Sequence, residues 1–93
     1  MREASIERRL SRKVKAAGGL ALKFTSPGWA GAPDRLVLFP RGQIVFVELK
    51  APGRKPRPLQ LKRHDELRAL GFHVEVIDSP EGVDEFMRRW ASE

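Results

Sequence analysis

Apolar side chains recur through the first part of the chain at the spacing of an α-helix. One stripe is formed by Ile6, Leu10, Val14 and Ala17. Arginine and lysine fill the opposite face, and a Gly-Gly pair at 18–19 stops the pattern. We therefore predict an amphipathic helix over residues 3–17 whose apolar side faces a core.

An alternation with a period of two follows. Leu20, Leu22 and Phe24 alternate with Ala21 and Lys23, which is typical of a half-buried strand. After a loop rich in Gly and Pro, residues 35–39 and 43–49 form two apolar runs separated by Pro40-Arg41-Gly42. This spacing predicts a β-hairpin with a three-residue loop, in which Pro40 opens a type I turn and Gly42 takes the left-handed position.

The second half of the chain favours a helix, a strand and a last helix. Pro58 to Leu70 is the predicted helix, with Leu59, Leu67 and Leu70 facing inward and Gly71 as the stop. The predicted strand, residues 72–77, runs parallel to the preceding one because the helix permits a right-handed crossover. The last helix is predicted from a helical stripe of Val83, Phe86, Met87 and Trp90. The expected order is α-β-β-β-α-β-α, an α/β fold.

The hairpin register brings two acids together. If Phe39 lies opposite Gln43, paired residue numbers sum to 82, so Leu36 faces Phe46 and Asp34 faces Glu48. The pleat sends Lys50 to the same face. Facing carboxylates repel one another unless a divalent cation offsets their charge. Two alternatives remain open: an ordinary Glu48–Lys50 ion pair with Asp34 capping the loop, and a one-residue slip that separates the two acids.

Composition adds charge to this picture. The chain has 93 residues, a size typical of one domain over 1–93 with a small core that a second copy would help to bury. Its 18 Lys and Arg against 12 Asp and Glu give a net charge of +6, which suits a polyanion such as nucleic acid. Cysteine is absent, which excludes disulfides and thiolate zinc sites. Signal-peptide and membrane-span patterns are also absent, so a soluble cytoplasmic protein is expected.

The order of elements and three short motifs resemble the PD-(D/E)XK nuclease superfamily, whose fold is the restriction-endonuclease-like α-β-β-β-α-β core, a mixed sheet flanked by helices. The motifs are Gly31-Ala32-Pro33-Asp34-Arg35, Val47-Glu48-Leu49-Lys50-Ala51-Pro52-Gly53 and Pro58-Leu59-Gln60. Together they are similar to the VRR-NUC (virus-type replication-repair nuclease) family. The resemblance spans nearly the whole chain.

The resemblance implies roles for particular residues. The catalytic set would be Asp34, Glu48 and Lys50, with Gln60 orienting water, lysine or phosphate. A helix-one acid is also expected. Glu7 matches the spacing of similar archaeal Holliday-junction resolvases through Leu10, Val14 and Gly18, and Glu3 remains a rival.

The same residues suggest a cofactor. Hard oxygen ligands from Asp34, Glu48 and the backbone carbonyl of Leu49 suit Mg²⁺ or Mn²⁺, with Glu7 acting through water or holding a second ion. Beside them, Arg54, Lys55 and Arg57 lie in a predicted loop and are candidate DNA-binding cations. The two histidines, His64 and His73, are interpreted as structural or surface residues.

The implied activity is that of a metal-dependent endodeoxyribonuclease from a phage or bacterium, acting in replication or repair. Structure-selective cutting of flaps or junctions, and a homodimer that presents two sites to branched DNA, are expected from the resolvase likeness. The competing hypothesis is a basic nucleic-acid-binding module without catalysis. Such a module would have no use for facing carboxylates.

Overall fold

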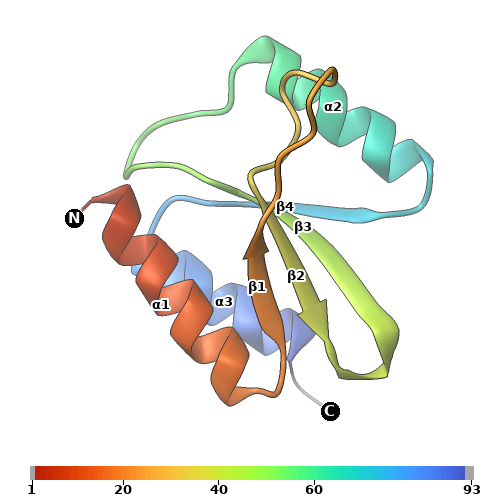
Figure 1. The fold of residues 1–93 in the computed structure, drawn as a ribbon. Helices are drawn as coiled ribbons and strands as arrows, with labels where there is room; N and C mark the ends of the chain where they lie inside the picture. The colour runs from red at the N-terminus through yellow and green to blue at the C-terminus, as the bar shows by residue number, and fades with distance from the viewer. Residues whose placement is uncertain (1, 92–93) are drawn as a thin grey trace.

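A computed structural model describes residues 2–91 of the chain (Figure 1). Three helices and four strands follow one another in the predicted order. The helices are α1 (Glu3–Ala16), α2 (Pro58–Ala69) and α3 (Pro80–Trp90). The strands are β1 (Leu20–Lys23), β2 (Arg35–Phe39), β3 (Gln43–Leu49) and β4 (His73–Ile77).

The strands form one mixed sheet in the order β1-β2-β3-β4. β1, β2 and β3 pair antiparallel, and β4 lies parallel to β3, as the crossover through α2 predicts. The hairpin register is also confirmed, since Phe39 pairs with Gln43 and Leu36 with Phe46. Its turn differs in one respect. Arg41 shares the left-handed conformation with Gly42, with φ of 72° and 74°.

Helices α1 and α3 lie side by side against one face of the sheet, which we call the closed face (Figure 1). The predicted α1 stripe is confirmed, because Ile6, Leu10 and Val14 are fully buried. They pack with Val83 and Phe86 of α3 and with a row of strand residues formed by Val37, Phe39, Val45, Val47, Leu49 and Ile77. This layer is the hydrophobic core.

The opposite face is covered by α2 at one end only (Figure 1). Its exposed apolar side chains, which we call the open face, are Leu20, Leu22, Ile44, Phe72 and Val76. Leu20 is 55% exposed, whereas Ala21 packs on the core, so β1 turns its leucines away from the core. For α2, the predicted inward side was wrong in part. Leu67 is buried, but Leu59 and Leu70 are exposed.

No helix within residues 2–91 has the length and apolar character needed to cross a membrane.

Candidate active site

Two acidic side chains meet where β2 begins and β3 ends. Arg35 pairs with Val47, so continuing the ladder by one residue sets Asp34 beside Glu48, as predicted. The backbone N–H of Leu49 donates a hydrogen bond of 3.2 Å to Oδ1 of Asp34 and ties the two strands together. Glu48 is only 2% exposed. The slipped register and its separated acids are therefore excluded.

Burial disfavours the ionised form of both carboxyl groups. It raises the pKa of Glu48 to about 7, and the charge of Asp34 adds to the effect, while Lys50 opposes it. The pKa of Asp34 is also raised, chiefly by burial, and the hydrogen bond from Leu49 works against that rise. A positive charge placed between the two groups would favour their ionised forms. The pair is thus electrostatically suited to a cation.

Glu48 is held by side chains from its own strand and from α2. Lys50 Nζ lies 3.6 Å from Oε2, and Gln60 Nε2 donates to the same oxygen at 3.1 Å. Gln60 is itself oriented, because its Oε1 accepts a hydrogen bond of 2.8 Å from the backbone N–H of Arg57, at the start of α2. The amide can therefore present only its NH₂ group to the carboxylate.

His64 is a third partner of Glu48. Its side chain is fully buried, and Nε2 lies 3.5 Å from Oε1 of Glu48. Burial lowers the pKa of His64, with a further contribution from Arg68, so the ring is neutral at pH 7. Within residues 2–91 the buried Nδ1 has no hydrogen-bond partner.

His64 was not expected in this site, because the sequence alone favoured a structural or surface role for it. The signal was the inward stripe Gln60, His64 and Leu67, at helical spacing, which becomes visible once the exposed leucines of α2 are set aside.

The two helix-one acids have different surroundings. Glu7 forms an ion pair with the guanidinium of Arg35, which in turn donates a hydrogen bond of 2.8 Å to the backbone carbonyl of Asp34. Glu3 is the helix-one acid whose charge contributes to the raised pKa of both Asp34 and Glu48. Glu7 therefore holds the Asp34 peptide through Arg35, whereas Glu3 acts on the carboxylates electrostatically.

Known proteins share the fold and much of the sequence of this chain. No protein-family model matches the chain. A solved structure described as "VRR_NUC domain" superposes with a TM-score of 0.88 at 38% identity, covering 95% of this chain and 96% of the other. This chain belongs to the VRR-NUC family. It is also 57% identical over 79 residues to "Putative nuclease p44" of Acyrthosiphon pisum secondary endosymbiont phage 1, covering 85% of each protein.

In this VRR-NUC domain a basic loop, residues 51–57, leads from the carboxylates to α2. Arg54, Lys55 and Arg57 are exposed, and none of their side chains has a hydrogen bond or ion pair within the described part of the chain. The loop begins directly after Lys50, so three unpaired cations adjoin the acidic pair. This arrangement leaves the cations available to an anionic partner.

A second loop of this VRR-NUC domain, which contains Trp29 and Ala30, is held against α2 by Arg63. The Nε of Arg63 donates to the carbonyl of Ala30 at 2.8 Å, and its guanidinium lies over the ring of Trp29 at 5.1 Å. Gly31 has φ of 88°, and a Cβ there would approach Leu59 to 2.9 Å. The loop is therefore pressed against α2 immediately before Pro33 and Asp34.

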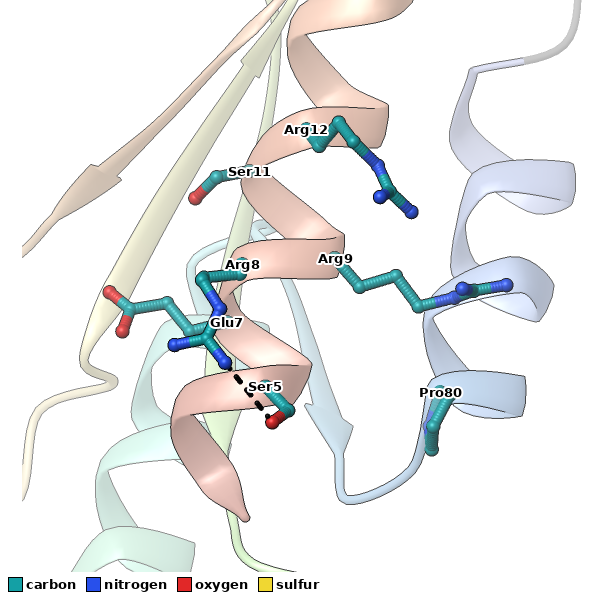
Figure 2. A pocket seen from close by; sticks show the side chains of 7 residues that line it. All are labelled: Ser5, Glu7, Arg8, Arg9, Ser11, Arg12 and Pro80. Carbon is teal, nitrogen blue, oxygen red and sulfur yellow. Dashed lines mark hydrogen bonds between the residues drawn. The ribbon is translucent and has the colours of Figure 1, made fainter. Parts of the chain in front are cut away.

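The domain also has a hollow away from the carboxylate pair. It is an open groove of about 760 Å³ along the outer side of α1 (Figure 2), lined by Ser5, Glu7, Arg8, Arg9, Ser11, Arg12 and Pro80. None of Asp34, Glu48 and Lys50 lines it, so the groove is separate from the carboxylate pair. Arg9 is paired with Asp84, Arg8 donates a hydrogen bond to Ser5, and Arg12 has no hydrogen bond or ion pair among residues 2–91.

Proposed function

We propose that the protein is a metal-dependent DNA endonuclease that hydrolyses phosphodiester bonds. The observation that carries this proposal is the pair of Asp34 and Glu48, with Lys50 beside them, inside a VRR-NUC fold. The phage relative named as a nuclease supports the same activity. A purely DNA-binding module would gain nothing from a buried Glu48 beside a half-buried Asp34, because their repulsion opposes folding.

The donor set fits Mg²⁺ or Mn²⁺. Within residues 2–91 no three His, Cys, Asp or Glu side chains converge tightly enough to form a complete protein cage. Mg²⁺ does not require one, because it is usually held by one or two carboxylates together with water and substrate oxygens. Asp34, Glu48 and the carbonyl of Leu49 would hold it. When bound, such an ion offsets negative charge on the phosphate and favours deprotonated water.

The remaining side chains prepare the site for a phosphodiester. Lys50, with its ammonium 3.6 Å from Glu48, would stabilise charge that develops on the phosphate and help to position the attacking water. Gln60 would hold Glu48 in place through its NH₂ group. Glu3 or Glu7 would supply the helix-one acid, and the electrostatic effect of Glu3 on both carboxylates supports Glu3.

DNA affinity would come from cations outside the carboxylate pair. Arg54, Lys55 and Arg57 carry unpaired charge beside it, and phosphate contacts supply most of the sequence-independent affinity of DNA-binding proteins. On α1, Arg8 and Arg12 lie one turn apart along the groove of Figure 2 and would add further phosphate contacts. Cleavage and affinity are thereby assigned to different residues.

A homodimer would complete the nuclease and present two sites to branched DNA. The open face supports it, because several large apolar side chains exposed on one face of a sheet are typical of a surface that contacts another protein. Leu20 and Leu22 lie at its edge, on β1. Sedimentation at micromolar concentration should give twice 10.5 kDa, and Leu20→Ser with Leu22→Ser should give 10.5 kDa. A wild-type monomer both with and without junction DNA would contradict the dimer.

The activity is tested by incubation with labelled duplex, flap, splayed-arm and four-way-junction DNA in Mg²⁺, Mn²⁺ or EDTA. We expect metal-dependent cleavage, with branched substrates cut faster than duplex. Asp34→Asn and Lys50→Ala should abolish cleavage and leave DNA affinity within severalfold. Cutting by Asp34→Asn at the wild-type rate would assign the activity to a contaminant and restore the binding-module hypothesis.

The complementary variant separates binding from catalysis. Arg54→Ala with Lys55→Ala should weaken DNA binding and flatten its salt dependence by about one unit of slope for each phosphate interaction removed. Lys62→Ala, an exposed cation on α2 outside the loop, is the matched control and should leave the slope unchanged. Equal salt slopes for wild type and the double variant would remove the loop from the DNA interface.

A further inference from the structure

His64 is a polar side chain buried where packing alone would favour an apolar one. The side chain is fully buried, and Nδ1 has no partner among the described residues. Leaving a buried nitrogen unpaired costs stability, and an apolar side chain of similar size would avoid that cost. The polar contact that the ring does make is the one from Nε2 to Oε1 of Glu48.

The contact defines which nitrogen carries the proton. A neutral imidazole has one N–H donor and one acceptor nitrogen. With the proton on Nε2, the donor faces a carboxylate oxygen and only a bare lone pair is left at Nδ1. With the proton on Nδ1, a buried N–H has no acceptor and a lone pair faces Glu48. The first arrangement is the more favourable one, because it pairs the N–H donor with a carboxylate oxygen and leaves only an acceptor nitrogen without a partner.

Gln60 and His64 take different oxygens of the same carboxylate. Gln60 donates to Oε2 and His64 lies beside Oε1, and the two residues are one helical turn apart on α2. Lys50 adds a second contact to Oε2. A carboxylate offers about four lone-pair positions. Three contacts therefore hold both oxygens of Glu48 and still leave room for a cation.

We propose that His64 is a positioning residue that, through Nε2–H, clamps Glu48 together with Gln60 and so sets the affinity of the site for a divalent cation. The proposal rests on the proposed metal-dependent function, and it adds a residue to it. Hydrogen-bond partners of metal-binding side chains typically change metal affinity or activity ~10–100-fold when they are removed.

The position of α2 does not depend on this contact. Arg63 anchors the helix to the loop at Ala30 and Trp29, and Arg68 donates to the carbonyl of Val74 at 2.9 Å. Leu67 is buried one turn further along. Substitutions at His64 should therefore alter Glu48 without releasing the helix.

The test compares two amides that place a donor at different positions. His64→Gln puts an NH₂ group near the position of Nε2, whereas His64→Asn puts it near that of Nδ1; His64→Leu removes the donor. Mn²⁺ affinity is measured on the full chain, without DNA, from the electron paramagnetic resonance signal of free Mn²⁺. We expect ~10–100-fold weaker binding by the Asn and Leu variants and recovery to within about threefold by the Gln variant.

The controls separate this inference from the proposed function. His73→Leu alters the other histidine, whose ring is tilted against that of Trp90 with the centroids 4.5 Å apart, and should leave Mn²⁺ affinity unchanged. No Mn²⁺ binding by wild type, or undiminished binding by Asp34→Asn, would overturn the metal site itself. Normal wild-type binding with equal affinity in the Gln and Asn variants would overturn the role of His64 alone.

A spectroscopic readout checks the tautomer and does not require a stable variant. The ¹⁵N spectrum of the wild-type protein should show a protonated Nε2 and an unprotonated Nδ1 for His64, both with and without Mg²⁺. If the Leu variant fails to fold, the comparison of the Gln and Asn variants still decides the proposal. A proton on Nδ1 in the Mg²⁺-bound protein would overturn it.

Discussion

The two faces of the sheet are built from the same strands but differ in how deeply their side chains are buried and in the chemistry of those side chains. The closed face, under α1 and α3, buries aliphatic and aromatic side chains around Val47 and Phe86. On the other face, Glu48 is buried against His64 of α2, and the leucines beyond that helix are exposed. Alternation along β3 produces the contrast, because Val47 and Glu48 are neighbours that point to opposite sides.

The closed face supplies most of the stability of the domain, whereas the face beneath α2 carries the groups of the candidate active site. A small domain has few side chains with which to bury a core, and here nearly all of them lie on the closed face. The face beneath α2 can therefore hold charged groups at a cost that the closed face offsets. Substitutions on the closed face should act on folding, and those beneath α2 should act on ions and substrate.

The largest effect is expected from Phe86→Ala. The ring is fully buried and lies 6.0 Å from that of Phe39, so its removal leaves a cavity in the centre of the closed face. We expect a loss of ~3–5 kcal/mol in the free energy of unfolding, measured by urea denaturation. A loss below about 1 kcal/mol would mean that the closed face does not dominate stability.

Glu48 should make the metal-free protein less stable as pH rises. Its folded pKa of about 7 lies above the unfolded value of 4.5, so the folded state retains a proton that the unfolded state has lost. This contribution is fully present below about pH 4.5 and is lost by about pH 7. It amounts to ~3 kcal/mol as an order of magnitude.

The matched variant is Glu48→Gln, which cannot titrate. In EDTA, its free energy of unfolding relative to wild type should rise between pH 4.5 and pH 7, as followed by urea denaturation. Excess Mn²⁺ at pH 7.5 should reduce that difference by stabilising wild type, by about 2–3 kcal/mol at a hundredfold excess over the dissociation constant. Parallel curves for the two proteins in EDTA would show that Glu48 ionises normally.

A smaller effect is expected at the loop that precedes Asp34. Arg63→Ala removes the hydrogen bond to Ala30 and the stacking on Trp29, together worth ~1–2 kcal/mol. Hydrogen exchange should then accelerate in residues 26–33 and stay unchanged in α3. Exchange that accelerates equally in both segments would mean that the loop is not a separate unit of the structure.

The smallest effect on folding is expected from Leu22→Ser on the open face. The side chain is exposed, so the free energy of unfolding of the monomer should stay within about 0.5 kcal/mol of wild type. A much larger loss at a concentration where the protein is monomeric would show that this face contributes to the core.

The chain order, the hairpin register and the helical stripes of α1 and α3 were predictable, because period and turn residues encode them locally. The inward side of β1 was harder to predict from the sequence. Alternation shows that the strand has two different sides but not which of them faces the core, and in the structure α1 covers the side with Ala21. His64 was missed for a related reason: its stripe with Gln60 and Leu67 competes in the sequence with the leucines of α2, and only the contact with Glu48 shows which stripe faces inward. Glu3 and Glu7 differ by one helical turn, and only the position of Arg35 tells their surroundings apart.

One amide group connects the cationic loop to the acidic pair. Gln60 accepts a hydrogen bond from the backbone of Arg57, where the loop ends, and donates another to Glu48. A phosphate that draws the loop toward itself would therefore pull on the group that orients a carboxylate. Ion binding and DNA binding would then be coupled, and thermodynamic reciprocity requires each to change the affinity for the other by the same factor. The affinity of the carboxylates for a metal ion would then depend on whether a phosphate is bound at the loop, before any bond of the DNA is broken.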